Sequence, residues 1–401
     1  MFVSNKSYAQ SAVPTVFALD AARKGLRPVS VNQISQPTLP VVQTIFPDRS
    51  YKAKYRAWHL MYPCRVSPVW EPIPELKDFD FKALSIVNTG LAKQGHTDAV
   101  LTPMLAGYSG AQPFKMKSEK GEYFVKAVLD GDVGDTVSKL AKEYYIGTSL
   151  ASAKVGAQYF GFEALENVDS PNVAFLVSSL LQAGPLGAQP FRSELFKLAK
   201  GGESGPFLQQ LLHLLRGFHK TEEPNLLSVG PCGRGPLQHF TDIMKQASEK
   251  GYIEGFEQQA LQSYQNRLIA AYKLRGGDLE KNHVFIHADM HASNIRRDWQ
   301  SSRLYAIDFG DSGMGDPARE LAYFLFMMDV PMALASPLIR LYQREVTRYP
   351  EAFYERTLLA LASERITRYV KILGWGGREK QEARDYQRRI EDDLPRVATW
   401  I

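Results

Sequence analysis

The sequence predicts an α+β protein with two lobes, in which a small antiparallel sheet precedes a mostly helical lobe. Residues 100–128 have the pattern of three strands joined by tight turns. A further apolar strand over residues 173–181 is ended by Gly184 and Pro185. Beyond this break, apolar residues recur at helical spacing. We therefore expect the strand-rich lobe to span residues 96–182 and the helical lobe to span residues 183–401.

Residues 1–95 fall outside both expected lobes. The first 50 residues are rich in Ser, Pro, Val and Gln, and their apolar residues have only weak periodicity. Residues 51–75 carry many aromatic residues and prolines. This composition predicts a partly irregular N-terminal extension. Its role is open, and a protein partner could bind there.

The composition excludes several classes of protein. Of the 401 residues, 44% are apolar and 23% are charged, with a net charge of +5, which is ordinary for a soluble protein. The basic residues are spread along the chain, so no nucleic-acid partner is expected. The two cysteines, Cys64 and Cys232, lack metal-ligand spacing and favour a reducing, cytoplasmic location. We find no secretory signal and no apolar run of the roughly 18 residues that span a membrane.

The turn after the first strand of the predicted meander contains small residues. Gly107, Ser109 and Gly110 would let backbone N–H groups approach phosphate oxygens. Hairpins with such turns are common, so this signal is weak by itself. The sequence GxxxxGK is absent, which excludes a P-loop nucleotide site.

A lysine and a glutamate follow in the same predicted lobe. Lys126 lies within the apolar third strand, and Glu143 lies on a helix expected over about residues 136–151. A strand lysine paired with a glutamate of the next helix can hold the phosphates of a nucleotide. Alternatively, both side chains could simply face solvent.

The stretch from Val284 to Leu321 contains several polar side chains that could take part in catalysis or metal binding. Two short apolar runs lead into carboxylates, the first into His287 and Asp289 and the second into Asp308. Carboxylates at the ends of buried strands are costly unless something pairs with them. Asp289, Asn294 and Asp308 all offer side-chain oxygen atoms, which are the ligands that a hard divalent cation binds. Phosphoryl transfer requires an aspartate placed at the acceptor hydroxyl and an Asn/Asp pair that binds magnesium. Alternatively, the stretch could be a β-hairpin whose aspartates only cap its ends.

These residues resemble a known family. Residues 287–294, HADMHASN, match the HxDxxxxN catalytic loop of the aminoglycoside phosphotransferase and choline kinase superfamily. Residues 307–311, IDFGD, and the later sequence Gly-Asp-Pro at 315–317 are similar to its metal-binding segment. The resemblance covers about residues 97–330 and implies a two-lobed protein-kinase-like fold.

The resemblance also implies the ligands. The expected cofactors are ATP and Mg²⁺, and the magnesium would be held by Asn294 and Asp308. Asp289 would orient or deprotonate the acceptor hydroxyl, and His287 would brace the catalytic loop.

In the other lobe, the resemblance implies that Lys126 contacts the phosphates and is positioned by Glu143. The adenine would lie against the backbone around Ser179 and Leu181. The turn containing Gly107 and its neighbours would cover the phosphates.

The spacing after the second run favours a small acceptor. Only eight positions separate Asp308 from Asp316, which caps a helix with Pro317 at its first position. That leaves no room for a long segment on which a polypeptide could dock. We expect a hydroxyl-bearing small molecule, such as an antibiotic, an amino alcohol or a sugar-like metabolite. Alternatives are a protein acceptor, a non-catalytic nucleotide-binding module and transfer of a nucleotidyl group.

Overall fold

The computed structural model describes most of the chain beyond residue 80. The described residues are 43–44, 81–104, 111–129, 133–150, 155–165, 173–181, 183–185, 188–221, 226, 229–232, 236–253, 255–277, 279–298, 303–345, 352–374, 381–399 and 401. The predictions for Gly107, Ser109 and Gly110, and those for most of the N-terminal extension, lie outside these ranges.

The first lobe is built on a six-stranded sheet with the strand order β1-β2-β3-β4-β6-β5. All its pairings are antiparallel except that of β1 with β2. The predicted meander of β2, β3 and β4 is confirmed. The strands are β1 (Gln43–Thr44), β2 (Val100–Pro103), β3 (Gln112–Ser118), β4 (Gly121–Val128), β5 (Tyr159–Leu165) and β6 (Val173–Ser179).

Both faces of this sheet are buried near β6. Successive side chains of a strand point to opposite faces, so Phe175 packs in the cluster containing Leu91 of α3 (Phe81–Lys93). Leu176 packs in the cluster containing Leu140 of α4 (Val133–Leu150). Helices on both sides explain why residues 173–177 of β6 are an unbroken apolar run.

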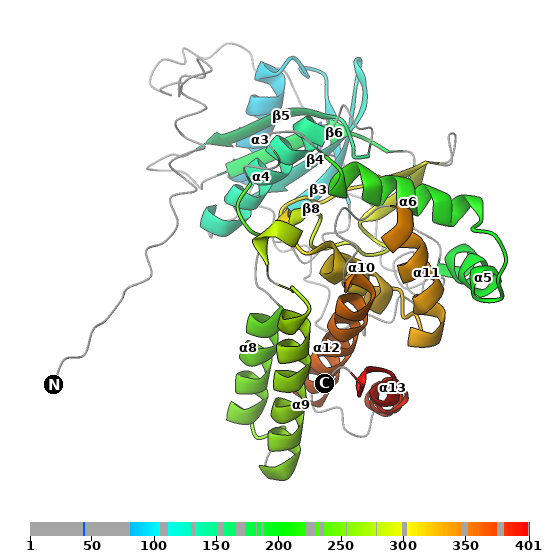
Figure 1. Cartoon of the computed structure of the whole chain (residues 1–401). Helices are drawn as coiled ribbons and strands as arrows, with labels where there is room; N and C mark the ends of the chain where they lie inside the picture. The colour runs from blue at the N-terminus through cyan, green and yellow to red at the C-terminus, as the bar shows by residue number, and fades with distance from the viewer. Residues whose placement is uncertain are drawn as a thin grey trace.

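The second lobe is mostly helical and lies below the sheet in Figure 1. Two small sheets lie in this part of the chain, β10-β9-β7 and β11-β8. Their strands are β7 (Ala183–Pro185), β8 (Val284–Ile286), β9 (Ile295–Asp298), β10 (Leu304–Ala306) and β11 (Gly313–Gly315). The helices are α5 (Ala188–Ala199), α6 (Pro206–His219), α8 (Pro236–Glu249), α9 (Gly255–Leu274), α10 (Pro317–Met327), α11 (Met332–Glu345), α12 (Phe353–Gly374) and α13 (Gln381–Val397). The expected α+β, two-lobed architecture is therefore confirmed.

Phe309 packs where the two lobes meet. Its fully buried ring lies 6.5 Å from the ring of Tyr159 on β5 and 6.1 Å from that of Phe218 on α6, between ring centroids. The His287 ring lies 5.1 Å away. Phe309 thus joins the sheet, α6 and the segment before Asp289 in one apolar cluster.

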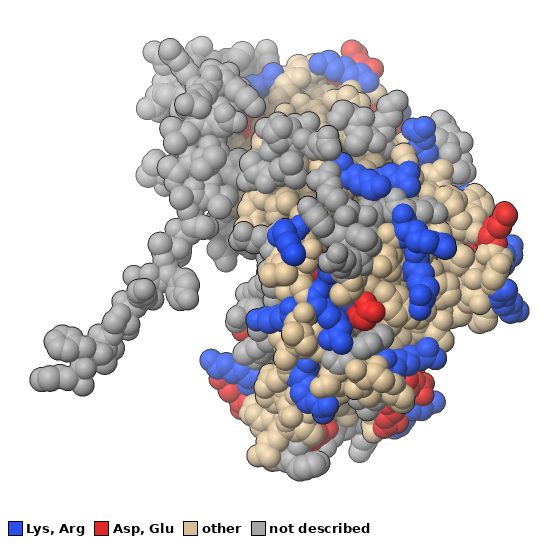
Figure 2. Space-filling model, viewed as in Figure 1, with Lys and Arg blue, Asp and Glu red and all other residues tan. Residues whose placement is uncertain are grey.

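The molecular surface is uneven in charge. On the face drawn in Figure 2, Lys and Arg predominate over Asp and Glu in the middle of the molecule, where the sheet meets the helices. Among the described residues, no helix combines the length and apolar character needed to cross a membrane.

Candidate active site

Lys126 joins three segments that are far apart in the sequence. It is 9% exposed on β4, and its Nζ lies 2.9 Å from Glu143 Oε2 and 2.8 Å from Asp308 Oδ1. The predicted pairing of Lys126 with Glu143 is therefore present. Burial opposes the charged ammonium, but the carboxylates of Glu143 and Asp308 outweigh it and raise the pKa of Lys126. The lysine is positively charged at neutral pH.

A tyrosine that was not predicted holds Glu143 in place. The hydroxyl of Tyr159 donates to Glu143 Oε1 over 3.1 Å, and both groups are buried. Burial raises the pKa of the Tyr159 phenol, so it remains a donor. Gly147, one turn further along α4, makes room for the ring, because a Cβ there would lie 2.1 Å from Tyr159 Cε2.

We predict that Tyr159→Phe weakens binding of the nucleotide expected from the sequence about three- to tenfold and destabilises the fold by about 1–2 kcal/mol, because one oxygen of a buried carboxylate loses its donor. Nucleotide titration and urea unfolding would measure the two effects. Tyr144→Phe on the same helix is the matched control, since the Tyr144 ring stacks on Phe162 and that contact survives the change. Equal behaviour of the two variants would contradict the prediction.

Asp289 receives several donors in the loop after β8. Its Oδ2 accepts from Asn294 Nδ2 over 2.9 Å, and its Oδ1 accepts from the hydroxyl of Tyr323 over 3.1 Å. His291 Nε2 lies 3.5 Å from Oδ2. Burial opposes the negative charge, but His291, His287 and Tyr323 outweigh it and lower the pKa of Asp289. Asp289 is therefore a carboxylate whose orientation is fixed.

The backbone of this loop is held by a buried glutamate. Glu320 Oε1 accepts from the backbone N–H groups of His287 over 2.5 Å and of Ala288 over 3.1 Å. The positive φ of 66° at Ala288 turns the chain here. The other oxygen of Glu320 pairs with His219, which also contacts the hydroxyl of Tyr342. These contacts fix the loop to α6, α10 and α11.

His287 connects the two carboxylate-bearing segments. Its Nε2 lies 2.9 Å from the carbonyl oxygen of Ile307, and its Nδ1 accepts from the backbone N–H of Asp289 over 3.3 Å. The backbone N–H of Ile307 donates in turn to the carbonyl of Asn294 over 2.9 Å. Asp289, Asn294 and Asp308 are therefore positioned by one hydrogen-bonded unit.

The side chains of Asn294 and Asp308 suit a magnesium ion that also binds phosphates. Asn294 Nδ2 donates to both the carbonyl oxygen and Oδ2 of Asp289, which leaves Oδ1 as its acceptor oxygen. Asp308 uses Oδ1 for Lys126 and has a positive φ of 67°. The described residues contain no cluster of three His, Cys, Asp or Glu that could enclose a metal. Magnesium rarely needs such a cluster, because waters and substrate phosphates complete its octahedron.

The residues expected at the adenine lie where β6 ends. The backbone N–H of Ser179 donates to the carbonyl of Gln158 over 2.7 Å, and Ser179 Oγ accepts from the Gln158 N–H over 3.0 Å. Leu181 is half-buried against the main core. Because the Ser179 N–H is already engaged within the sheet, Leu181 is the better candidate for a backbone donor to a base.

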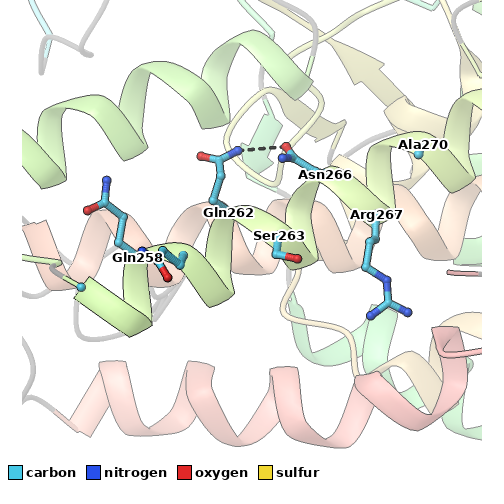
Figure 3. A pocket seen from close by; sticks show the side chains of 8 residues that line it. Gln258, Gln262, Ser263, Asn266, Arg267 and Ala270 are labelled. Carbon is cyan, nitrogen blue, oxygen red and sulfur yellow. Dashed lines mark hydrogen bonds between the residues drawn. The ribbon is translucent and has the colours of Figure 1, made fainter.

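A separate depression of about 770 Å³ runs along α9 (Figure 3). Half of its lining residues carry side-chain amides, and Arg267 donates to the carbonyl of Ile401 over 3.1 Å. None of the residues predicted for catalysis lines it, so we place the candidate active site at the Lys126–Asp289 cluster. The lining residues are Gly255, Gln258, Gln259, Gln262, Ser263, Asn266, Arg267 and Ala270.

Two residues of α10 that contact the loop could have been found from the sequence. Asp316 caps α10, and its side chain accepts from the Ala318 N–H as predicted. Glu320 and Tyr323 lie four and seven positions after Asp316. Residues at this spacing share a helix face, so both could have been assigned to the face that meets the loop.

The comparisons with known proteins agree with this geometry. Residues 101–354 match the family model described as the phosphotransferase enzyme family, which is more than half of the 401-residue chain. The chain therefore belongs to this phosphotransferase family. No curated protein matches it significantly.

Solved structures share the fold at low identity. Ethanolamine kinase from Plasmodium vivax is 14% identical with a TM-score of 0.52, covering 90% of this chain and 100% of its own. A candidate aminoglycoside phosphotransferase from Ralstonia eutropha is 15% identical with a TM-score of 0.53, covering 80% and 97%. Choline kinase from Cryptosporidium parvum is 10% identical with a TM-score of 0.50, covering 78% and 94%. The expected protein-kinase-like fold is thereby confirmed.

Proposed function

We propose that the protein transfers the γ-phosphate of ATP to a hydroxyl group of a small molecule. The observation that carries this proposal is the bridge from Lys126 to Glu143 and Asp308, next to the loop that fixes Asp289. Such a transfer passes through a transition state in which charge spreads over the phosphoryl oxygens, so catalysis is mainly positioning and charge neutralisation. The cluster supplies a fixed cation, a fixed carboxylate and oxygen ligands.

Asp289 is proposed to receive the acceptor. Asp289 Oδ1 can accept a hydrogen bond from a hydroxyl group, since it already accepts one from the hydroxyl of Tyr323 over 3.1 Å. In the reaction, the acceptor oxygen would attack the γ-phosphorus while its proton passes to the carboxylate, and ADP would leave. His287 and Glu320 would keep the loop in this geometry.

Lys126 is proposed to contact the nucleotide phosphates, with Glu143 fixing its direction. Two contacts of Nζ go to Glu143 and Asp308, and the third hydrogen of an ammonium would remain for a phosphate oxygen. Asn294 and Asp308 would hold Mg²⁺, which neutralises phosphate charge when bound.

The segment after Asp308 supports a small acceptor. It passes through a short turn into β11, which pairs with β8, and α10 begins at Pro317. The described chain thus offers no long segment between residues 308 and 317 on which a polypeptide substrate could dock. The structural neighbours include choline, ethanolamine and aminoglycoside kinases by name, so amino alcohols and aminoglycosides belong in an acceptor panel.

We predict that the protein transfers label from γ-labelled ATP, and not from α-labelled ATP, to a member of a hydroxylated metabolite and antibiotic panel. Removal of Mg²⁺ with a chelator should abolish transfer, because the phosphates then lack their bridging cation. Chromatography of the labelled products would measure this. Transfer of α-label would identify a nucleotidyl transferase, and ATP binding without any transfer would identify a non-catalytic module.

A further inference from the structure

One side of α9 carries a strip of polar side chains that the proposed active site does not use. The depression of about 770 Å³ follows this side, and its eight lining residues recur every three or four positions (Figure 3). From Gly255 to Ala270 the helix rises about 22 Å. α12 packs against a different side of α9, where the buried Gln265 donates to Ser363 Oγ over 2.6 Å. We call the eight lining residues, which are named above, the amide strip.

The amide strip is almost free of charge. Of its members, only Arg267 is charged, and its guanidinium already donates to the carbonyl oxygen of Ile401 over 3.1 Å. The exposed residues of α13, by contrast, include Arg384, Arg388 and Glu391. Depletion of charged residues distinguishes the centre of a protein interface from the rest of a protein surface. The amide strip therefore has the composition of an interface centre.

The side-chain amides of the strip retain groups that can bind a partner. Gln262 Nε2 donates to Asn266 Oδ1 over 2.9 Å, which leaves the oxygen of Gln262 as an acceptor and Nδ2 of Asn266 as a donor. Within the described part of the chain, the side chains of Gln258 and Gln259 have no hydrogen-bond partner. Because an amide group both donates and accepts, amides can pair with other amides.

The strip presents matching residue types when it is read in either direction. Residues equally distant from its centre are Gly255 and Ala270, Gln258 and Arg267, Gln259 and Asn266, and Gln262 and Ser263. Small residues thus lie at both ends, and hydrogen-bonding side chains lie between them. When two identical helices pair antiparallel about a two-fold axis, residues equally distant from the centre lie opposite one another. The strip is therefore complementary to a second copy of itself.

Charge favours the antiparallel pairing over a parallel one. In the antiparallel pair, Arg267 of each copy lies opposite Gln258 of the other, whose side-chain oxygen can accept a hydrogen bond. The two Arg267 residues are then about 13 Å apart along the helix axis. A parallel pair would place these like charges beside one another and would also align the two helix dipoles.

We propose that the amide strip is the surface through which two copies of this chain pair, with their α9 helices antiparallel about a two-fold axis. None of the residues predicted for catalysis belongs to the strip, so the pairing does not depend on the proposed phosphotransferase function. One helix face is smaller than the roughly 800 Å² per partner of a standard interface. We therefore expect a reversible dimer with a dissociation constant on the order of 10 µM.

Sedimentation equilibrium of the full-length protein between roughly 1 and 200 µM tests the proposal. The average mass of the wild type should rise from that of one copy toward that of two. Gln262→Glu places two carboxylates next to the two-fold axis, so the dissociation constant should increase about tenfold or more. Gln209→Glu on the exposed side of α6 is the matched control and should dimerise like the wild type.

A charge exchange separates lost pairing from lost folding. Gln262→Lys alone should also weaken the dimer, because two ammonium groups then meet at the axis. An equimolar mixture of Gln262→Glu with Gln262→Lys should dimerise again, since opposite charges face each other. A variant that had merely unfolded would not recover in the mixture.

Cross-linking determines the orientation of the two helices. Chains carrying Gln259→Cys are mixed with differently tagged chains carrying Asn266→Cys and are treated with a short bismaleimide. The antiparallel pair should give mainly cross-links that join one chain of each kind. The wild type supplies the blank for Cys64 and Cys232.

Three results would overturn the proposal. The first is a protein that remains a single copy over the whole concentration range. The second is a dimer that Gln262→Glu leaves unchanged, or that the mixture of opposite charges does not restore. The third is cross-linking mainly between chains of the same kind, which would indicate a parallel pair. The phosphotransferase function is judged separately by label transfer.

Discussion

Replacing Asp289 with asparagine is expected to slow γ-phosphate transfer about 10²- to 10⁴-fold, which is the usual contribution of a positioned acid or base. Asparagine has nearly the same shape, so the hydroxyl of Tyr323 can still donate to its side-chain oxygen. It cannot take the proton of the acceptor, and it removes a negative charge from the loop. Rates of label transfer from γ-labelled ATP, measured at saturating acceptor, would give the effect.

The contacts of Lys126 with Glu143 and Asp308 do not involve Asp289, so ATP should still bind this variant, with a small loss of affinity because Asn294 loses its acceptor at Asp289 Oδ2. Nucleotide titration is therefore the internal control. Asp392→Asn on the exposed face of α13 is the matched substitution and should transfer phosphate at the wild-type rate. An Asp289→Asn variant as active as Asp392→Asn would remove Asp289 from the proposed mechanism.

The sequence predicted those parts of the site that lie within short motifs. Asp289 and Asn294 come from one loop, and the Asp316 cap comes from a single Asp-Pro pair. The pairing of Lys126 with Glu143 was also predictable, because a strand and the helix after it are neighbours in space. In each case the residues are close in sequence, so their spacing along the chain determines how they lie relative to one another in the structure.

The partners that were missed come from distant segments. Tyr159 reaches Glu143 because β5 and β6 pair in the sheet and α4 packs against both strands, and no local pattern encodes this order. His219 and Glu320 are 101 positions apart, and their contact joins the end of α6 to α10. Helical periodicity predicts that His219 is buried, but it does not name the buried carboxylate that it contacts.

The small sheets show the same limit. The polar turn between β9 and β10 follows from the sequence, and the two strands pair as a hairpin. The partner of β8 is β11, whose residues are Gly-Met-Gly and have no strand pattern. Gly313 and Gly315 are needed there because a Cβ would lie 2.6 Å from the Gly230 carbonyl oxygen or 2.5 Å from Ile286 Cδ1. Close packing rather than strand propensity selects these glycines.

Replacing Arg356 with methionine is expected to destabilise the fold by about 3–5 kcal/mol, the usual cost of leaving a buried charge unpaired. Arg356 is 1% exposed on α12, and its Nε lies 2.9 Å from Asp316 Oδ2. It also donates to the carbonyl of Arg275 over 3.3 Å, which ties the end of α9 to this site. Methionine fills much of the same volume as arginine. The decrease in the free energy of unfolding would therefore come mainly from leaving the Asp316 carboxylate without its counter-ion. Urea unfolding would measure it, with the exposed Arg384→Met on α13 as a control expected to change stability by about 0–1 kcal/mol.

The double variant Asp316→Asn with Arg356→Met distinguishes the charge from the packing. Asp316 also accepts from the hydroxyl of Tyr272 over 2.7 Å and caps α10 through the Ala318 N–H. Asparagine can keep the cap through Oδ1, and its Nδ2 can donate to the hydroxyl oxygen of Tyr272, without needing a counter-ion. The double variant should therefore be more stable than Arg356→Met alone, because no unpaired charge remains buried. If the two are equally unstable, the loss comes from packing around the guanidinium. If Arg356→Met is as stable as Arg384→Met, the ion pair does not support the junction of α9, α10 and α12.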